Sequence, residues 1–291
     1  MKYYISCTFI LILSIFICLI FKGCSYGILN CFNFNKIKST KKEKIKEYKI
    51  MEIHKRKNPT VYTQGLAYNS GYIYESGGLY KQSTITKMEW PSQKIINQYK
   101  LPQEIFAEGI AFSKNKDLIY QLSWREKKIL VYSLKDLNFI KYIDLPKEMK
   151  EGWGLCQGRK DNEFFATDGS FYIYILNIDE EDKLVFNKKI KVTEGKNPIL
   201  YLNDLSFDGN FVYANVYFSP YIFKINIDNG NVIKKYNFSN LINYEIKTGS
   251  LNRNDYNNGN VLNGITYIDD NKNFLITGKE WGFYYEIKFE E

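Results

Sequence analysis

The chain has 291 residues, of which 45% are hydrophobic and 17% aromatic, so it can form one large domain or two small ones with a sizeable core. Its net charge of +8 is concentrated in residues 36–57 and in two lysines near the N-terminus, Lys2 and Lys22. The remainder, 58–291, is nearly neutral, which argues against a nucleic-acid-binding domain. The single histidine, His54, excludes a metal site built on several histidines.

The N-terminus carries a hydrophobic segment. Residues 5–21 are weakly polar to apolar and are bounded by Lys2 and Lys22. The run is long for the core of a signal peptide and long enough to span a bilayer, and no convincing cleavage site follows it. We therefore predict an uncleaved signal anchor in residues 1–22, with a cleaved signal peptide as the alternative.

A basic linker is predicted over residues 23–47. Its solvated state is the simpler interpretation, and contact with anionic lipid heads is the alternative. We expect a membrane-anchored protein whose main domain lies on the lumenal or extracellular side, within the secretory pathway. The lysines at 36–49 would prefer the cytoplasmic side, but they lie some distance from the span.

An internal repeat defines the domain from residue 48 onward. Five segments, at 62–68, 106–112, 152–158, 202–208 and 262–268, each place Gly or Asp just before an apolar strand. When aligned at Gly65, Gly109, Gly154, Asp204 and Gly264, they are 44, 45, 50 and 60 residues apart. Those intervals match the length of one blade of a β-propeller.

Alternation of apolar and polar residues predicts three further strands in each of the first four intervals. The fifth interval has only two, at 273–278 and 283–289, and residues 49–54 can supply the missing one. We therefore predict an all-β, five-bladed β-propeller over 48–291, closed by an N-terminal strand and monomeric. Residues 238–260 form the one long insertion, interpreted as a surface loop or, alternatively, as a partial lid.

The repeated segments predict a site. The innermost strands of a propeller start at one mouth of its central channel, so residues just before the repeated position should converge there. Those residues are Gln64, Glu108, Trp153, Asn203 and Asn263. Cys156, the only cysteine in this region, is expected to be a buried small hydrophobe because it lacks a histidine partner.

The same motifs resemble the plant-type, also bacterial, glutaminyl-peptide cyclotransferases. The segments are Tyr-Thr-Gln-Gly-Leu at 62–66, Phe-Ala-Glu-Gly-Ile at 106–110, Glu-Gly-Trp-Gly-Leu at 151–155, Leu-Asn-Asp-Leu at 202–205, Tyr-Ala-Asn-Val at 213–216, Val-Leu-Asn-Gly-Ile at 261–265 and Thr-Gly-Lys-Glu-Trp at 277–281. The resemblance spans about 48–289. It implies a five-bladed propeller that converts the N-terminal glutamine of peptides and proteins to pyroglutamate with release of ammonia, without metal or cofactor.

The resemblance also implies roles for individual residues. Glu108 corresponds to the catalytic acid and base, and Lys279 is expected to join it in catalysis. The residues expected to bind the substrate are Gln64, Asn203 and an aromatic wall of Tyr62, Phe106, Trp124, Trp153 and Tyr217. The chain departs from the family pattern at Tyr62, where Phe is common, at Tyr217, where Trp is expected, and at Gly282, where Pro often stands.

Physical chemistry adds two expectations. The apolar wall should raise the pKa of Glu108, and a nearby Lys279 would oppose that rise. Lys279, Gln64 or Asn203 could donate to the γ-carbonyl oxygen of the substrate, and the sequence does not choose among them. The alternatives are a non-catalytic propeller that binds a partner and a calcium-dependent propeller hydrolase, which would need more acids at the strand starts.

Overall fold

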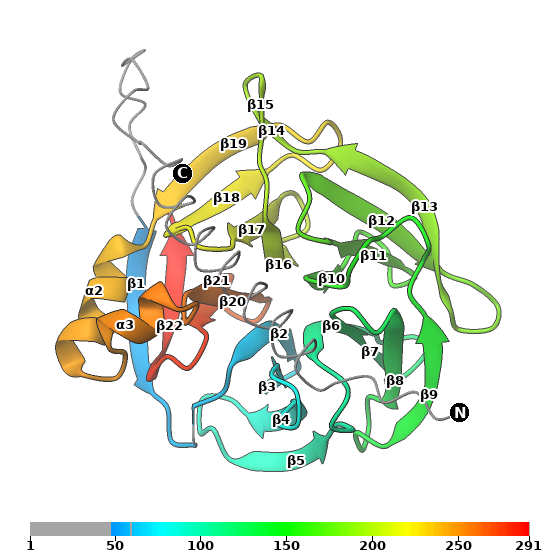
Figure 1. Ribbon diagram of the computed structural model, residues 1–291, viewed down its shortest axis with the longest axis horizontal. Coiled ribbons are helices and arrows are strands. Elements are labelled where there is room, and N and C mark those ends of the chain that lie inside the picture. The colour runs from blue at the N-terminus through cyan, green and yellow to red at the C-terminus, as the bar shows by residue number, and fades with distance from the viewer. Residues whose placement is uncertain (1–47, 59, 291) are drawn as a thin grey trace, which may run out of the picture. The chain divides into compact units, whose positions relative to one another are not determined.

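The computed structural model describes residues 48–58 and 60–290, and these form a five-bladed β-propeller. Five antiparallel four-stranded sheets are arranged around a central axis (Figure 1). The first four are β2 (Thr63–Asn69) to β5 (Ile95–Lys100), β6 (Ala107–Ser113) to β9 (Phe139–Asp144), β10 (Leu155–Gln157) to β13 (Leu184–Lys191), and β16 (Leu202–Phe207) to β19 (Val232–Asn237). The predicted all-β, five-bladed propeller is confirmed.

The strands within these blades follow the predicted pattern. They are β3 (Tyr72–Gly77) and β4 (Thr84–Glu89), β7 (Leu118–Ser123) and β8 (Lys128–Ser133), β11 (Glu163–Ala166) and β12 (Tyr172–Ile178), and β17 (Val212–Val216) and β18 (Tyr221–Ile225). A short hairpin of two strands, β14 (Thr193–Glu194) and β15 (Asn197–Pro198), was not predicted. It lies between the third and fourth blades in the sequence.

The fifth blade joins both parts of the chain. It contains β20 (Leu262–Ile268), β21 (Asn273–Gly278), β22 (Phe283–Phe289) and, as its outermost strand, β1 (Tyr48–Lys55). β1 pairs with β22 in antiparallel register. Just beyond β1, the Arg56 guanidinium hydrogen-bonds to Glu75 of blade one and to the Tyr284 hydroxyl of blade five, at 2.9 and 2.7 Å. One buried side chain therefore connects the first and last blades.

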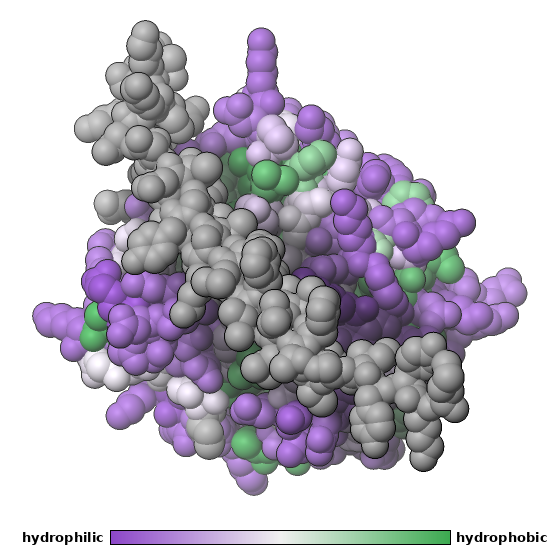
Figure 2. Space-filling view, viewed as in Figure 1, coloured by the Kyte–Doolittle hydropathy of each residue, from purple (hydrophilic) through white to green (hydrophobic). Residues whose placement is uncertain are grey.

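The core is divided among the spaces between blades. Each of five clusters of buried apolar side chains joins two consecutive blades, including the last to the first. Fully burying one such side chain stabilises the fold by about 1.5–3 kcal/mol. Cys156 belongs to the cluster between blades three and four, as expected for a buried small hydrophobe. On the face in Figure 2, hydrophobic residues form only small patches among hydrophilic ones.

The innermost strands approach one another too closely for side chains. A methyl group added at Gly109 would lie 2.3 Å from Leu155 N, and one at Gly154 would lie 2.1 Å from Asn203 O. Gly109 N also donates to Trp153 O at 2.6 Å. These contacts explain the repeated glycine, because only a residue without Cβ permits such backbone packing.

The insertion at 238–260 contains two helices, α2 (Ser239–Thr248) and α3 (Arg253–Asn257), so its interpretation as a surface loop was wrong. Leu241 and Ile242 join the core between blades four and five. The Glu245 carboxylate is fully buried and accepts hydrogen bonds from Gly282 N and the Tyr285 hydroxyl, at 3.0 and 2.8 Å. Tertiary contacts stabilise this short helix, and the pattern of apolar residues in its sequence predicts it only weakly.

The same helix explains Gly282, the departure from the family pattern. Proline has no N–H to donate to Glu245. A methyl group at Gly282 would lie 2.4 Å from Ser250 Cβ, so no side chain fits there. Glycine at this position therefore allows α2 and the residues after it to pack against blade five.

The predicted anchor at 1–22 and linker at 23–47 lie outside the described residues. Within the described ranges, no helix is long and apolar enough to cross a membrane.

The glycine contacts predict a graded loss of stability. Gly154→Ala should lower the free energy of unfolding by about 3 kcal/mol, the upper end for overpacking, because the added methyl meets backbone. Gly65→Ala is the matched control: it occupies the same position of the repeat, but its nearest neighbours are 3.0 Å away. It should cost roughly 1 kcal/mol. Urea unfolding measures both, and equal losses would contradict the explanation by clearance.

Candidate active site

A chain of hydrogen-bonded amides leads to Glu108 at the start of β6. Gln64 Nε2 donates to Glu108 Oε1 at 3.0 Å, and Gln64 Oε1 accepts from Asn263 Nδ2 at 3.1 Å. Asn263 Oδ1 in turn accepts from Asn215 Nδ2 at 2.8 Å. All four side chains are buried. Because the Gln64 oxygen is engaged by Asn263, its NH2 group is directed at the carboxyl of Glu108.

Burial dominates the electrostatics of Glu108. It raises the pKa of this carboxyl well above its usual range, and the Lys279 ammonium opposes part of the rise. Lys279 follows β21 and is itself buried, which lowers its pKa to about 8 against the opposing effects of Glu108 and Asp204. The desolvation of each charge is thus the largest effect at both groups. Both predicted directions, the rise and its opposition by Lys279, are found.

Lys279 lies between two tyrosine rings. Its Nζ is 4.8 Å from the centroid of Tyr62 and 4.7 Å from that of Tyr217. Both distances suit cation–π attraction, which is stronger at desolvated sites. The end of the insertion covers the two phenols, because a methyl group at Gly259 would lie 3.2 Å from Tyr217 Oη and 3.3 Å from Tyr62 Oη. The insertion therefore reaches the site, as the lid alternative requires.

The predicted aromatic residues form two groups of packed rings. Phe106 contacts Tyr62 edge to face at a centroid distance of 6.4 Å and Trp124 at 5.4 Å. Trp153 contacts Tyr217 at 6.0 Å. Tyr62 of one group and Tyr217 of the other lie on either side of Lys279.

Glu151 joins the two tryptophans and was not predicted. Its Oε2 accepts from Trp124 Nε1 at 2.7 Å and from Trp153 Nε1 at 2.9 Å, while Oε1 accepts from Arg125 Nε at 3.0 Å. Partial burial disfavours the charged form, but these hydrogen bonds outweigh it and hold the pKa of Glu151 below its usual range. The Glu-Gly-Trp motif at 151–153 was the available signal for this contact.

Asn203 provides an acceptor at the same mouth. Its Oδ1 is buried and has no hydrogen-bond partner, and its backbone oxygen accepts from Thr167 Oγ1 at 2.9 Å. A buried acceptor without a partner costs about 1–3 kcal/mol. Such an atom is suited to receive an N–H group from a ligand.

Asp204 replaces the glycine of the fourth repeat. Its fully buried carboxylate accepts backbone hydrogen bonds from Leu66 at 3.3 Å and from Ile265 at 2.9 Å, which belong to β2 and β20. Burial raises the pKa of Asp204 to about 8, and the hydrogen bonds oppose that rise. Asp204 therefore connects three blades across the channel.

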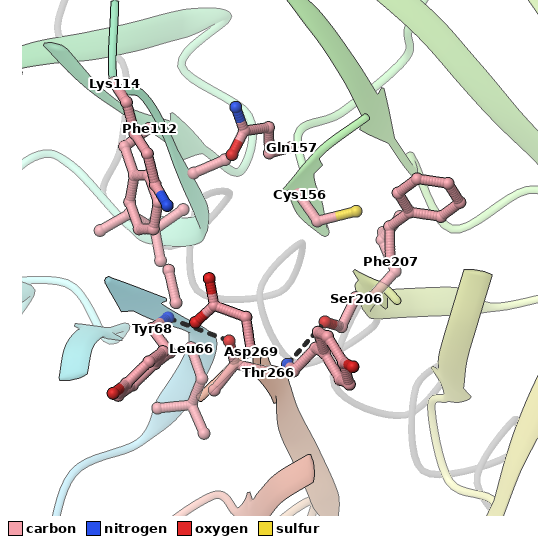
Figure 3. Close-up of a pocket in the computed structure, with 15 residues that line it drawn as sticks. Leu66, Tyr68, Phe112, Lys114, Cys156, Gln157, Ser206, Phe207, Thr266 and Asp269 are labelled. Carbon is pink, nitrogen blue, oxygen red and sulfur yellow. Dashed lines mark hydrogen bonds between the residues drawn. The ribbon is translucent and has the colours of Figure 1, made fainter. Parts of the chain in front are cut away.

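A separate cavity lies toward the other ends of the innermost strands (Figure 3). Its lining includes Leu66, Phe112, Cys156, Ser206 and Thr266, which follow the repeated position in their strands. None of the predicted site residues lines it. The residues expected to act on a substrate gather at the opposite mouth.

The comparison with protein families identifies the chain. The family described as glutamine cyclotransferase matches residues 25–289. The chain belongs to this family. The resemblance predicted from the repeated motifs is confirmed.

Individual relatives agree with the family. A glutaminyl-peptide cyclotransferase of Arabidopsis thaliana is 30% identical over 235 residues, which cover 80% of this chain and 69% of the relative. The crystal structure of Myxococcus xanthus glutaminyl cyclase has a TM-score of 0.72 at 23% identity, covering 86% of this chain and all of the other. The WD40 repeats of RRP9 share the fold more distantly, with a TM-score of 0.55 at 8% identity over 84% of this chain.

Asp204 predicts a pH dependence of stability. The pKa of an aspartate in an unfolded chain is about 3.9. With a folded pKa of about 8, Asp204 binds its proton more tightly in the folded state. Its contribution to stability is therefore present below about pH 4 and lost as the pH rises through 8.

The isosteric variant Asp204→Asn cannot ionise. Its free energy of unfolding relative to the unmodified protein should therefore be higher at pH 9 than at pH 5. Urea unfolding at both pH values measures this difference, in which the other titrating groups cancel. An unchanged difference would show that Asp204 does not titrate in this range.

Proposed function

We propose that this protein is a glutaminyl-peptide cyclotransferase, an aminoacyltransferase whose proton shuttle is Glu108. The observation that carries the proposal is the environment of this carboxyl, which is buried, hydrogen-bonded to Gln64 and beside the Lys279 ammonium. A carboxyl with a raised pKa can both accept and donate a proton near neutral pH. The family membership supports the same activity.

The reaction joins the two ends of one glutamine residue. The α-amine attacks the γ-carbonyl carbon, a C–N bond forms, and the bond to the γ-amide nitrogen breaks. The Glu108 carboxylate accepts a proton from the attacking amine and delivers it to the leaving nitrogen, which departs as ammonia. Since nucleophile and electrophile belong to one flexible side chain, holding it in a reactive conformation is a large part of catalysis.

We assign Lys279 to the γ-carbonyl oxygen, on which negative charge develops. The Gln64 NH2 already donates to Glu108, whereas the Lys279 ammonium is directed between two rings that exclude water. A cationic donor in such a desolvated place stabilises an oxyanion strongly. The unpartnered Asn203 Oδ1 is then suited to accept an N–H group of the substrate.

The aromatic wall encloses the glutamine side chain. Phe106, Trp124 and Trp153 supply apolar surface, and Glu151 fixes both indoles through their N–H groups. Fixed rings restrict the substrate to few conformations and keep water from the reacting atoms. Glu151 acts here as a positioning residue, since it contacts the wall.

The ends of the domain complete the proposal. The pairing of β1 with β22 supports closure of the ring by the N-terminal strand. The apolar run at 5–21 supports a membrane anchor, with a monomeric enzyme on the lumenal or extracellular side. In sealed microsomes the lumenal side is enclosed, so the domain should resist added protease and be digested once detergent is present. Digestion without detergent would contradict this orientation.

Replacing the proton shuttle should abolish turnover. Glu108→Gln keeps the shape and the contact with Gln64 but cannot exchange the proton, so kcat on a peptide that begins with glutamine should fall by about 10²–10⁴-fold. Ammonia release and pyroglutamate formation are the measurements. Glu104→Gln, an exposed site four residues earlier, is the matched control and should retain activity.

The outcome separates the enzyme from the alternative. If the unmodified protein binds such a peptide but releases no ammonia, the non-catalytic binding module is favoured. If Glu108→Gln keeps more than about a tenth of the activity, Glu108 is not the general acid and base.

Replacing Lys279 should change the pH profile of kcat/KM. Lys279→Gln removes the cation that lowers the pKa of Glu108, so the acid limb should move to higher pH. The alkaline limb due to Lys279, whose pKa is about 8, should disappear. The exposed control Lys147→Gln should leave both limbs in place. A profile of Lys279→Gln that matches the unmodified enzyme would remove Lys279 from the site.

A further inference from the structure

Three potential metal ligands meet on the outer strands of blade five. Glu52 and His54 alternate along β1, and Glu52 lies directly opposite Glu286 of β22 in the strand register. His54 Nε2 is 3.6 Å from Glu52 Oε2 and 3.8 Å from Glu286 Oε2. The three ligand atoms all lie within 4.8 Å of one another.

The histidine nitrogen is buried without a partner. His54 is only 9% exposed, and its Nε2 makes no hydrogen bond. Leaving a buried polar atom without a hydrogen bond destabilises the folded protein. Glu52 and Glu286 are also directly opposite each other on neighbouring strands. Like charges in such a pair destabilise the sheet. A cation bound among the three groups removes both penalties.

The surroundings hold two of the three ligands in place. Glu286 Oε1 accepts from the side-chain amides of Asn271 and Asn273, at 2.7 and 2.5 Å, which leaves Oε2 on the side of His54. The His54 ring packs edge to face on Trp90 at a centroid distance of 4.6 Å. Such outer contacts orient ligands in known metal sites. Glu52 is exposed, so an ion can enter from solvent.

We propose that Glu52, His54 and Glu286 form a zinc site, with water as the fourth ligand. Tetrahedral zinc with bonds of about 2.0–2.2 Å separates its ligand atoms by about 3.3–3.6 Å. The observed separations need only small side-chain rotations to reach that geometry. An imidazole nitrogen favours zinc over magnesium and calcium, which prefer six or more oxygen ligands.

The site is structural. It joins β1 to β22, the strands that complete the fifth blade, whereas Glu108 begins the innermost strand of blade two. The sequence led us to expect no metal, since one histidine cannot build a site alone. The strand register supplies the two carboxylates that complete it.

Zinc binding to the full-length protein tests the proposal. After treatment with chelator and its removal, ZnCl2 should bind with a stoichiometry of about one and raise Tm by about 5–10 °C at a free concentration of 100 times Kd. MgCl2 at the same concentration should leave Tm unchanged. Co²⁺ should give the strong visible absorption of tetrahedral coordination. Absence of a zinc-dependent shift in Tm would overturn the site.

Variants locate the bound ion. Glu52→Gln, at an exposed position that should not disturb folding, and His54→Asn should each weaken zinc binding at least about tenfold. Glu180→Gln, an exposed control, should bind zinc like the unmodified protein. Unchanged binding by Glu52→Gln and His54→Asn would show that zinc binds elsewhere. Turnover at 25 °C should survive chelation; its loss in protein that remains folded would contradict a structural role.

Discussion

The close approach of the innermost strands is the constraint on which the rest of the structure depends. At Gly109 and Gly154 neighbouring backbones meet at distances that leave no space for a Cβ atom. Where the fourth repeat has Asp204, its carboxylate occupies the channel and accepts hydrogen bonds from two other blades. Because the strands are fixed in this way, the residue before each of these positions is brought to one mouth, and the fold itself assembles the site.

This convergence buries two charged groups, and their desolvation shifts the pKa of each. Glu108 and Lys279 are both buried, so water stabilises neither charge. Each charge is stabilised by the other, and the rings of Tyr62 and Tyr217 add to the stabilisation of the Lys279 ammonium. Their pKa values move toward each other and toward neutral pH. A proton can then be transferred at small free-energy cost, which is what a shuttle between an amine and a leaving amide nitrogen requires.

Features that repeat along the chain could be predicted from the sequence, and features that depend on single long-range contacts could not. The strands expected at 273–278 and 283–289 match β21 and β22 because alternation and turn residues are local signals. α2 was missed because Glu245 is held by Gly282 and Tyr285, far along the chain. Glu151 was visible in its motif, but its bonds to two indoles depend on the fold.

Blade five shows how stability and function depend on the same contacts. It carries Asn263, which orients Gln64, and ends β21 just before Lys279. Its outermost strand comes from the other end of the domain, so separation of β1 from β22 would expose the edge of the sheet that holds these residues. Arg56 is hydrogen-bonded to Glu75 and Tyr284 at this junction, and Glu52, His54 and Glu286 lie together on the paired strands themselves. Contacts far from Glu108 therefore maintain the geometry on which Glu108 depends.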